Sequence, residues 1–260
     1  MNILDKIIFD KKKEIDQKSL IVPLERLKDS QRLSKIRNFK KAISSNAIDI
    51  ISEVKFRSPS EKNIMKFVDP VDVAMAYAKN GASAISVLTD QKYFGGNIDF
   101  IHQIRSAVEI PVLRKDFIIS EYQIWESYCI GADAILLIAD AINQKLLIDL
   151  YELSMELGLH VLVESHSIDS ISLINKLNPE IVGINCRNLE TMKTNLNLFK
   201  KVYKDLPVES IKVAESGINT RDDLMYIHSL GYGSALIGTS FMKSGNPGRA
   251  LAEILNRVYL

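Results

Sequence analysis

Cysteine is nearly absent from this sequence. Its two cysteines, Cys129 and Cys186, lie far apart in the chain. Such a pair builds no disulfide framework and lacks the spacing of metal ligands, which excludes disulfide-stabilised secreted domains and zinc modules. We therefore expect a protein of the reducing cytoplasm.

An excess of charge of one sign is missing as well. Lysine and arginine number 33 and aspartate and glutamate 32, which leaves a net charge of +1. The chain therefore has no electrostatic basis for binding nucleic acid or an anionic membrane, and we expect neither as a partner. No apolar run approaches the roughly 20 residues of a membrane span. The first residues, "MNILDKIIFDKKKEIDQ", also lack the apolar core and cleavage site of a signal peptide.

What the sequence does contain is a regular alternation of two kinds of segment. Beyond residue 46, short runs of Ile, Val, Leu and Ala alternate with longer stretches of helical spacing. The apolar runs are almost continuous, as in strands that are covered on both faces. They predict strands at 48–54, 83–88, 111–114, 133–138, 160–164, 181–185, 211–215 and 234–237. Helices are predicted at 70–80, 98–107, 120–130, 143–157, 167–176, 196–204, 220–229 and 247–258.

Eight strand–helix units predict an α/β protein with a closed parallel barrel, the (β/α)8 or TIM barrel, whose usual length is about 250 residues. The chain of 260 residues is 47% hydrophobic and suffices for one such domain, with the barrel at 47–260. An open, doubly wound sheet is the structural alternative, but it usually carries a glycine-rich turn after its first strand. Here the first strand is followed by "KFRSPSEKN", which contains no glycine.

Residues 1–46 precede the first strand and predict an N-terminal helical extension, with helices at 2–17 and 32–44. This segment is expected either to close the bottom of the barrel or to lie across one of its mouths. Its lysines at positions 11 to 13 are expected to form a solvated helix face. The chain ends with the eighth predicted helix, so we expect no further domain fused behind the barrel.

Charged and polar side chains recur where the predicted strands end. They are Glu53, Lys55, Lys115, Glu164, Asn185, Arg187, Glu215 and Ser216. The C-terminal ends of the strands carry the active site in this fold, because the following loops converge there. A single charge after a strand is as often only the first solvated residue of a loop. Three glutamates and two lysines at one end of a barrel, however, must pair when buried, and such pairs tune pKa values for acid–base catalysis.

The last two predicted strands are followed by loops suited to an anion. "ESGI" supplies Ser216 and Gly217, and "IGTS" supplies Gly238, Thr239 and Ser240. One such glycine is usually an ordinary turn residue, but the loops after strands 7 and 8 together form the common phosphate site of this fold. Other residues expected to reach the same anion are Lys55, Ser58 and Arg187. The predicted substrate is therefore a small phosphorylated molecule.

Seven segments, taken in order, resemble the signatures of the indole-3-glycerol-phosphate synthase family. They are "SEVKFRSPSEKNI", "SVLTDQKYFGG", "VLRKDFIISEYQIWES", "VLVESH", "GINCRNLETMKTNL", "VAESGI" and "LIGTSFMK". The resemblance runs from about Ile48 to the end, and the leading helices fit the family's N-terminal extension. Phosphoribosylanthranilate isomerase, a relative in fold, shares the phosphate loops but is not expected to carry "RKDFI" or the leading helices.

The resemblance implies ring closure of 1-(2-carboxyphenylamino)-1-deoxyribulose 5-phosphate to indole-3-glycerol phosphate, with loss of carbon dioxide and water, in tryptophan biosynthesis. It implies no metal or organic cofactor. Lys115 resembles the general acid and Glu164 the general base, while Lys55 either positions the carboxylate or acts as the acid in dehydration. Association with other enzymes of the same pathway is left open.

Further roles are implied by the same resemblance. Glu53 and Glu215 would hold the lysines and bind sugar hydroxyls, and Asn185 would orient the reacting part of the substrate. Arg187 would bind near the phosphate or the carboxylate. The implied phosphate ligands are Ser58, Ser216, Gly217, Gly238, and Thr239 or Ser240.

Several positions depart from the family pattern. The first loop has Phe56-Arg57 and Glu61-Lys62 where Arg-Ala and Lys-Gly are usual, which leaves its shape open. Cys186 replaces a common asparagine, and its side chain is expected to point away from the cavity. Candidates for a supporting or lining role at the same mouth are His166, Phe94 and Phe117.

Two other functions fit these residues. An isomerase of a phosphorylated aminosugar would use Glu164 as its base. A barrel that binds a phosphorylated metabolite without chemistry would need neither acid nor base, and the unbroken set of lysines and glutamates argues against it. Incubation with each substrate, followed by indole fluorescence, separates the two enzymes. A phosphate or sulfate ion is expected between "ESGI" and "IGTS".

Overall fold

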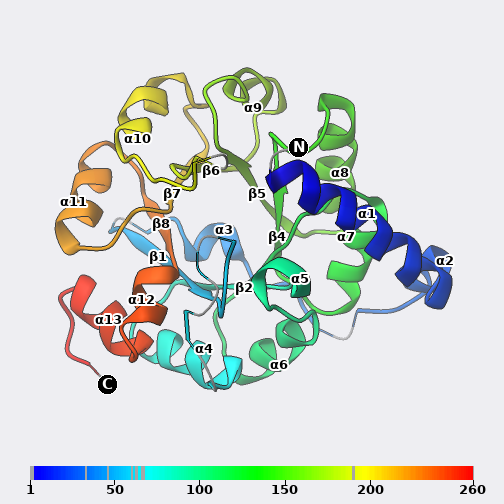
Figure 1. Cartoon of the computed structure of the whole chain (residues 1–260), viewed down its shortest axis with the longest axis horizontal. Helices are drawn as coiled ribbons and strands as arrows, with labels where there is room; N and C mark the ends of the chain where they lie inside the picture. The colour runs from blue at the N-terminus through cyan, green and yellow to red at the C-terminus, as the bar shows by residue number, and fades with distance from the viewer. Residues whose placement is uncertain are drawn as a thin grey trace.

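The computed structural model describes residues 3–32, 34–45, 47–59, 61, 64–65, 68–188 and 191–259. The strands of this part form one closed parallel barrel in chain order, from β1 round to β8 and back to β1 (Figure 1). They are β1 (Asp49–Val54), β2 (Ala84–Leu88), β3 (Val112–Lys115), β4 (Ala134–Ile138), β5 (His160–Ser165), β6 (Ile181–Asn185), β7 (Ile211–Glu215) and β8 (Ser234–Ile237). Each lies within one residue of its predicted bounds, so the (β/α)8 barrel is confirmed.

Helices surround this barrel, and their ends follow local capping chemistry. Asp69 accepts a hydrogen bond from the Val71 N–H at the start of α4, and Pro70 occupies the first turn, as expected. Thr220 and Asp223 form a capping box at the start of α11. The outer helices are α4 (Pro70–Lys79), α6 (Asp99–Ala107), α7 (Glu121–Cys129), α8 (Gln144–Glu156), α9 (Ile171–Leu177), α10 (Asn197–Val202), α11 (Arg221–Ser229) and α13 (Pro247–Ile254).

Within the barrel part of the chain, the sequence did not predict three short elements, and it placed the start of one helix too early. The 3-10 turn Tyr203–Asp205 follows α10, while α5 (Gln91–Phe94) and α12 (Thr239–Lys243) follow β2 and β8 directly. Helix α9 begins at Ile171 and not at residue 167, because the Ser167 hydroxyl donates to Asp140 Oδ1 at 2.7 Å and the Ser167 segment remains a loop. Side-chain hydrogen bonds of this kind compete with helix formation.

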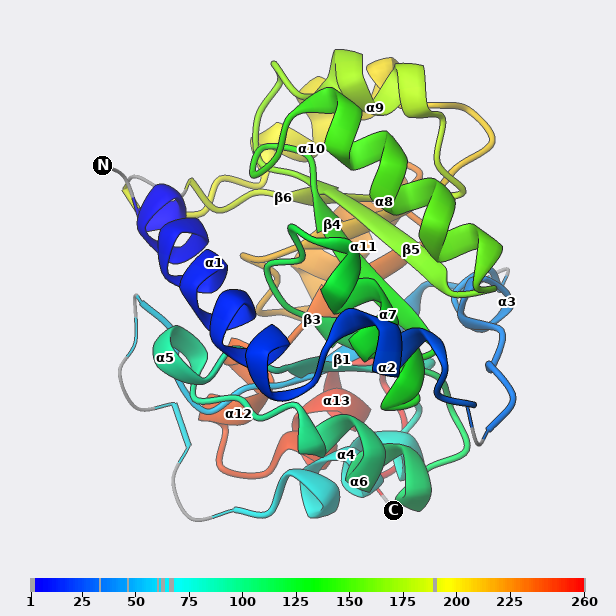
Figure 2. The same cartoon turned by 90° about the vertical axis from the view of Figure 1, so that its right-hand side faces the viewer.

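The N-terminal extension occupies both ends of the barrel. Figure 2 shows α1 (Ile3–Ile21) at one end and α3 (Phe39–Ala42) at the other. Residues of α1 line the cavity at the C-terminal ends of the strands. At the opposite end, Phe39 and Ile43 are fully buried and pack against the residues inside the barrel. The extension therefore closes the bottom and also covers part of the mouth.

The helix predicted at 32–44 is wrong over most of its length, because within the described part of this range only Phe39–Ala42 is helical. The Arg32 guanidinium donates to the carbonyl oxygen of Tyr128 at 2.8 Å, and that of Arg37 to the carbonyl oxygen of Ile110 at 3.0 Å. These contacts bind the segment to the loops below the barrel. Tertiary contacts of this kind outweigh weak local helix propensity. A further helix, α2 (Leu24–Lys28), lies between α1 and this segment.

The strands place charges inside the barrel by simple alternation. Successive side chains of a strand point to opposite faces. The inward-facing apolar residues include Ile51, Leu113, Leu162 and Val213. The position two residues after each of these is charged, and the four charges are Glu53, Lys115, Glu164 and Glu215. A period of two therefore directs all four into the C-terminal end of the same interior.

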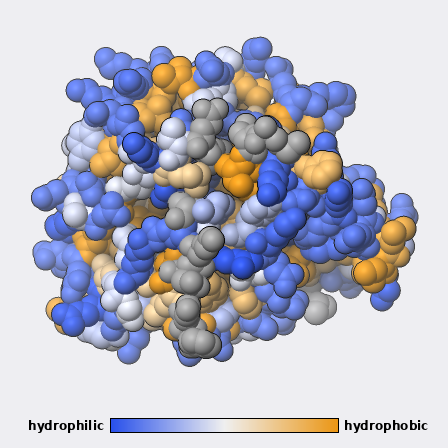
Figure 3. All heavy atoms as spheres, in the orientation of Figure 1, coloured by the Kyte–Doolittle hydropathy of each residue, from blue (hydrophilic) through white to orange (hydrophobic). Residues whose placement is uncertain are grey.

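The surface around the mouth is largely polar. Figure 3 views the molecule as Figure 1 does and shows that the outer face of α1 is mostly hydrophilic. Apolar side chains appear at its far end, where Leu20 and Ile21 are exposed. None of the helices in the described ranges combines the length and the apolar character that crossing a membrane requires.

Candidate active site

A cavity of about 260 Å³ opens at the C-terminal ends of the strands. All of the site residues predicted from the sequence line it, and they come from strand ends and loops distant in the chain. They are Glu53, Lys55, Ser58, Lys115, Glu164, Asn185, Arg187, Glu215, Ser216, Gly217, Gly238, Thr239 and Ser240. The structure therefore brings the predicted residues together, while their individual chemical roles stay predictions.

Lys115 is the centre of the charged part of this cavity. Its Nζ lies 3.3 Å from Glu164 Oε2, 3.6 Å from Glu215 Oε2 and 3.9 Å from Glu53 Oε2. Burial alone would lower the pKa of Lys115, but attraction by the three carboxylates outweighs burial and raises the pKa above its ordinary value. The ammonium form therefore persists throughout the neutral range and has a proton to donate.

Glu164 and Glu215 lie side by side and divide their ionisation unequally. Burial would raise the pKa of Glu164, but Lys115 and His166 outweigh it and lower the pKa to about 2. Burial, together with repulsion by Glu164, raises the pKa of Glu215 well above its ordinary value. Two adjacent buried carboxyl groups cannot both ionise cheaply. Glu164 is therefore the member that ionises first and can accept a proton, and Glu215 is the weaker acid of the two.

His166 contacts the anionic carboxylate from the side of the loop after β5. Its Nε2 lies 3.1 Å from Glu164 Oε1, and the ring is almost buried in the cavity wall. The backbone N–H of His166 donates to Asp140 Oδ2 at 2.8 Å, which fixes the start of the loop. The sequence suggested a supporting role for His166, and the structure places it beside the candidate base.

Glu53 and Lys55 form a second ion pair on β1. Lys55 Nζ lies 2.6 Å from Glu53 Oε1. Burial would raise the pKa of Glu53, but Lys55 and Lys115 outweigh it and lower the pKa below its ordinary value. Gly238 packs directly against this carboxylate, because a Cβ atom at position 238 would lie 2.6 Å from Glu53 Oε1. The glycine is therefore required by the position of Glu53 as well as by the loop.

The loops after β7 and β8 meet on one side of the cavity. Ser216 and Gly217 have φ values of 69° and 73°, in the left-handed region that favours glycine. A Cβ atom at position 217 would also lie 3.0 Å from Cys186 Sγ. The Ser240 hydroxyl donates to the Ile218 carbonyl oxygen at 3.3 Å and joins the two loops. This is the side on which the sequence predicts the phosphate.

The end of β6 and the loop that follows it place Asn185 and Arg187 at the cavity and Cys186 away from it. Asn185 Oδ1 accepts a hydrogen bond from the Arg187 N–H at 3.1 Å, and the Arg187 guanidinium donates to the Met192 carbonyl oxygen at 2.8 Å. Cys186 between them is buried among residues packed behind the barrel, as expected, and does not line the cavity. Burial raises the pKa of its thiol to about 11, so Cys186 is no nucleophile.

The first loop is held by contacts with its neighbours. Phe56 packs edge-on against Phe100, and the Arg57 guanidinium donates to the Lys92 carbonyl oxygen at 2.8 Å. Glu61 pairs with Lys243 at 2.7 Å. Lys62, the other unusual residue of this loop, lies outside the described residues. The bulky departures from the family pattern thus connect the first loop to the segments after β2 and β8.

Sequence reasoning missed most of the apolar wall of the cavity. Phe94 and Phe117 line it, as suggested, with ring centroids 5.9 Å apart. Part of the missing wall comes from the N-terminal helix, as Ile3, Leu4 and Ile7. Their spacing of one and three residues gives a helical face, but no local signal tells what that face covers.

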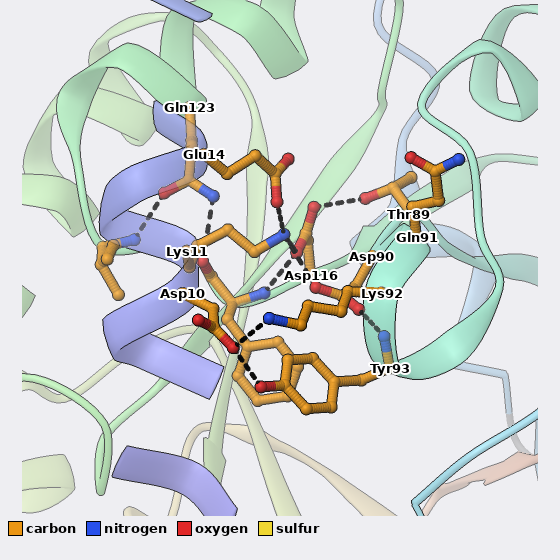
Figure 4. A network of polar contacts seen from close by, with 12 residues as sticks. Asp10, Lys11, Glu14, Thr89, Asp90, Gln91, Lys92, Tyr93, Asp116 and Gln123 are labelled. Atoms are coloured by element: carbon orange, nitrogen blue, oxygen red, sulfur yellow. Dashed lines mark hydrogen bonds and ion pairs between the residues drawn. The ribbon is translucent and has the colours of Figure 1, made fainter. Parts of the chain in front are cut away.

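The prediction of a solvated lysine face at positions 11 to 13 is wrong for one residue. Lys12 and Lys13 are exposed, whereas only 2% of Lys11 is exposed. Lys11 Nζ lies 2.9 Å from Asp90 Oδ2 and 3.0 Å from Asp116 Oδ1, as Figure 4 shows. Lys11 is buried because of tertiary contacts, since both carboxylates belong to loops that the sequence does not place near the extension.

Within the described ranges, no three His, Cys, Asp or Glu residues are grouped as metal ligands would be.

Comparison with known proteins gives a consistent result. Residues 4–254 match the sequence model of a family described as indole-3-glycerol phosphate synthase. A protein of that name from Geobacillus sp. (strain WCH70) is 42% identical over 257 residues, 98% of each chain. Another, from Thermoanaerobacter sp. (strain X514), is 41% identical over 241 residues, 93% of this chain and 92% of the other.

Solved structures show a likeness in fold alone. N-acetylmannosamine-6-phosphate 2-epimerase from Clostridium perfringens aligns with a TM-score of 0.61 at 16% identity, over 81% of this chain and 93% of the other. Thiamine phosphate pyrophosphorylase from Pyrococcus furiosus aligns with a TM-score of 0.59 at 13% identity, over 84% and 96%. Such low identity carries no argument about the reaction.

Proposed function

The chain belongs to the indole-3-glycerol phosphate synthase family, and from this premise we propose how its cavity performs the reaction. The enzyme is a carboxy-lyase of tryptophan biosynthesis that acts on a phosphorylated small molecule. We propose 1-(2-carboxyphenylamino)-1-deoxyribulose 5-phosphate as the substrate and indole-3-glycerol phosphate as the product. Overall, the substrate with its carboxyl group ionised takes up one proton and releases carbon dioxide and water.

Ring closure is the first proposed step. The aromatic carbon that bears the carboxylate attacks the ketone carbon, and the new carbon–carbon bond takes its electron pair from the ring. The ketone oxygen becomes a hydroxyl group by taking a proton from Lys115. The persistent charge of Lys115 among three carboxylates supports this role, because a general acid must hold its proton until the transition state. Carbon dioxide then leaves, and its bonding pair restores the aromatic ring.

Dehydration is the second proposed step. The hydroxyl group leaves as water after protonation by a lysine, and Glu164 removes a proton from the carbon next to the nitrogen. The electron pair of that carbon–hydrogen bond becomes the double bond of the indole ring. The lowered pKa of Glu164 keeps it ionised for this task, and His166 at 3.1 Å helps to hold it there. Lys55 can serve as the acid with the proton that it already holds, and Lys115 can do so after it regains from solvent the proton that it gave to the ketone oxygen. Both lysines contact Glu53.

The remaining residues are proposed to bind and orient the substrate. Asn185 would orient the part that reacts, and Arg187 would bind near the phosphate or the carboxylate. Glu53 and Glu215 would hold the lysines and bind the sugar hydroxyls. The proposed phosphate ligands are Ser58, Ser216, Gly217, Gly238, Thr239 and Ser240. Anchoring at the phosphate end and enclosure of the aromatic end would bring the two carbon atoms together, which accounts for much of the acceleration in such reactions.

One observation carries the proposal: a single ammonium group, Lys115 Nζ, lies within 4 Å of three carboxylates in one cavity. The test is incubation of the purified chain with the proposed substrate, with indole fluorescence and released carbon dioxide measured together. We expect both signals to appear in equal amounts. Conversion without either signal would point to an aminosugar isomerase and would overturn the proposal. Binding of the proposed substrate without any conversion would point to a barrel that binds a phosphorylated metabolite and catalyses no reaction.

A further inference from the structure

Lys11 is the most deeply buried charged residue of helix α1, with only 2% of it exposed. Its Nζ contacts Asp90 Oδ2 at 2.9 Å, Asp116 Oδ1 at 3.0 Å and Glu14 Oε2 at 2.8 Å (Figure 4). Burying an ammonium group is costly unless carboxylates surround it, and here they come from two different loops. An exposed position on the same helix would have avoided that cost, so the location of Lys11 requires an explanation.

Each of the two loop carboxylates also holds an aromatic residue of the cavity. Asp90 Oδ1 accepts the Tyr93 N–H at 2.7 Å and caps α5, whose last residue is Phe94. Asp116 Oδ1 accepts the Phe117 N–H at 2.8 Å. The same ammonium group therefore contacts both carboxylates that fix the backbone next to the two rings.

The helix that carries Lys11 presents an apolar face to the same place. Ile7 and Leu4 precede Lys11 by four and seven residues, so all three lie on one side of α1. Ile7 and Leu4 line the cavity together with Phe94 and Phe117. A second contact joins α1 to α5, because Lys92 Nζ lies 2.7 Å from Asp10 Oδ2 (Figure 4).

We propose that Lys11 is a positioning residue for the aromatic part of the substrate. Its ammonium group holds α1, Phe94 and Phe117 together as one apolar wall, which encloses the ring that must attack the ketone. This inference rests on the proposed function, since that function supplies the aromatic group. Lys11 touches neither the reacting atoms nor the phosphate loops, so its loss affects binding of the ring and leaves binding of the phosphate unchanged.

The neighbouring residues provide matched variants. Lys11→Met removes the ammonium group, and Lys12→Met is the control because Lys12 is exposed one position further along the same helix. Lys11→Met leaves two buried carboxylates without this cation and therefore risks unfolding. Lys11→Met combined with Asp90→Asn avoids that risk. Asparagine still caps α5, and Asp116 keeps its contacts with Arg114 at 3.1 Å and Thr89 at 2.6 Å.

The experiment compares two competitive inhibitors. One is the substrate reduced at its ketone, which carries the aromatic ring but cannot close it, and the other is ribulose 5-phosphate, which has no aromatic ring. For Lys11→Met and the double variant, we expect KM and the inhibition constant of the reduced substrate to rise about tenfold, with kcat within about threefold of the unaltered enzyme. The inhibition constant of ribulose 5-phosphate should not change. Lys12→Met should match the unaltered enzyme throughout.

Three results would overturn the inference or separate it from its premise. Equal weakening of both inhibitors in the folded double variant would mean that Lys11 only stabilises the fold. Unchanged KM in Lys11→Met would mean that the wall needs no ammonium group. If the unaltered enzyme does not convert the substrate, the proposed function itself fails. If the unaltered enzyme converts it and the double variant has the same KM and inhibition constants, only the role of Lys11 is refuted.

Discussion

Lys115 Nζ lies 3.3 Å from Glu164 Oε2, although the two residues belong to strands β3 and β5 that are not neighbours in the barrel. Both side chains point inward because each stands two positions after an apolar interior residue. The contact places a candidate acid and a candidate base on the same side of one cavity. The candidate acid Lys115 and the candidate base Glu164 can therefore act on the same bound substrate.

Replacement of Lys115 tests the acid. We expect Lys115→Met to lower kcat by roughly 10³-fold with a small change in KM, because the proton of the first step is lost while the binding residues remain. The measurement is steady-state indole fluorescence, with circular dichroism as a check of folding. Lys145→Met is the matched control, since Lys145 is exposed and does not line the cavity. Near-normal turnover in Lys115→Met would remove Lys115 from the mechanism.

Replacement of His166 tests its influence on the base. His166 is one of the groups that lower the pKa of Glu164, so His166→Gln should raise the pKa of Glu164. Glu164 must be ionised to accept a proton, and the acid limb of the kcat profile should therefore move to higher pH, with little change of kcat at neutral pH because the pKa starts at about 2. An unshifted acid limb would show that Lys115 alone determines the ionisation of Glu164.

Replacement of Glu215 tests the unequal ionisation of the carboxylate pair. The pKa of Glu215 is raised in the folded state, so its contribution to the free energy of unfolding is complete below the unfolded value of 4.5 and is lost as the pH rises towards the folded value. Glu215→Gln imitates the protonated form and cannot ionise. Its free energy of unfolding should therefore exceed that of the unaltered enzyme by an amount that grows with pH.

Urea denaturation from pH ~4 to ~8 measures this difference, with the exposed Glu253→Gln as the control. The curves of Glu215→Gln and the unaltered enzyme should meet at the acid end and separate towards neutral pH. A difference that stays constant across this range would mean that Glu215 is ionised in the folded enzyme.

Replacement of Gly238 tests the packing between the β8 loop and Glu53. A methyl group at position 238 would lie 2.6 Å from Glu53 Oε1, so Gly238→Ala must displace the carboxylate or the loop. Displacements of this size cost roughly 10²-fold in kcat/KM when they move catalytic groups. Gly233→Ala is the control, because a methyl group there meets no atom within 4 Å. Equal activity of the two variants would mean that the position of Glu53 is unimportant.

The barrel could be predicted from the sequence because its signals are local. Apolar runs such as 181–185 and 211–215 coincide with the observed strands, and the Asp69-Pro70 pair begins α4 as expected. The charges could be assigned to one end because a strand has a period of two and a parallel barrel aligns its carboxyl ends. The strand period and the alignment of the strand ends can be applied without knowing which residues are in contact.

The same sequence could not disclose contacts between distant segments. The 32–44 segment has helical composition, yet Arg32 and Arg37 bind carbonyl groups below the barrel and only Phe39–Ala42 is helical in its described part. Lys11 looks identical to Lys12 and Lys13 along the chain. Its partners Asp90 and Asp116 are supplied by other loops, and local pattern contains no information about them.

The sequence by itself therefore determined the architecture and the end of the barrel at which lysines and glutamates gather. Only the tertiary structure decided how these charges pair, which carboxyl group of Glu164 and Glu215 is the weaker acid, and how α1 completes the apolar wall. The physical reason is that periodicity and capping act over a few residues, whereas pKa values and buried ion pairs depend on distances between atoms that folding alone brings together.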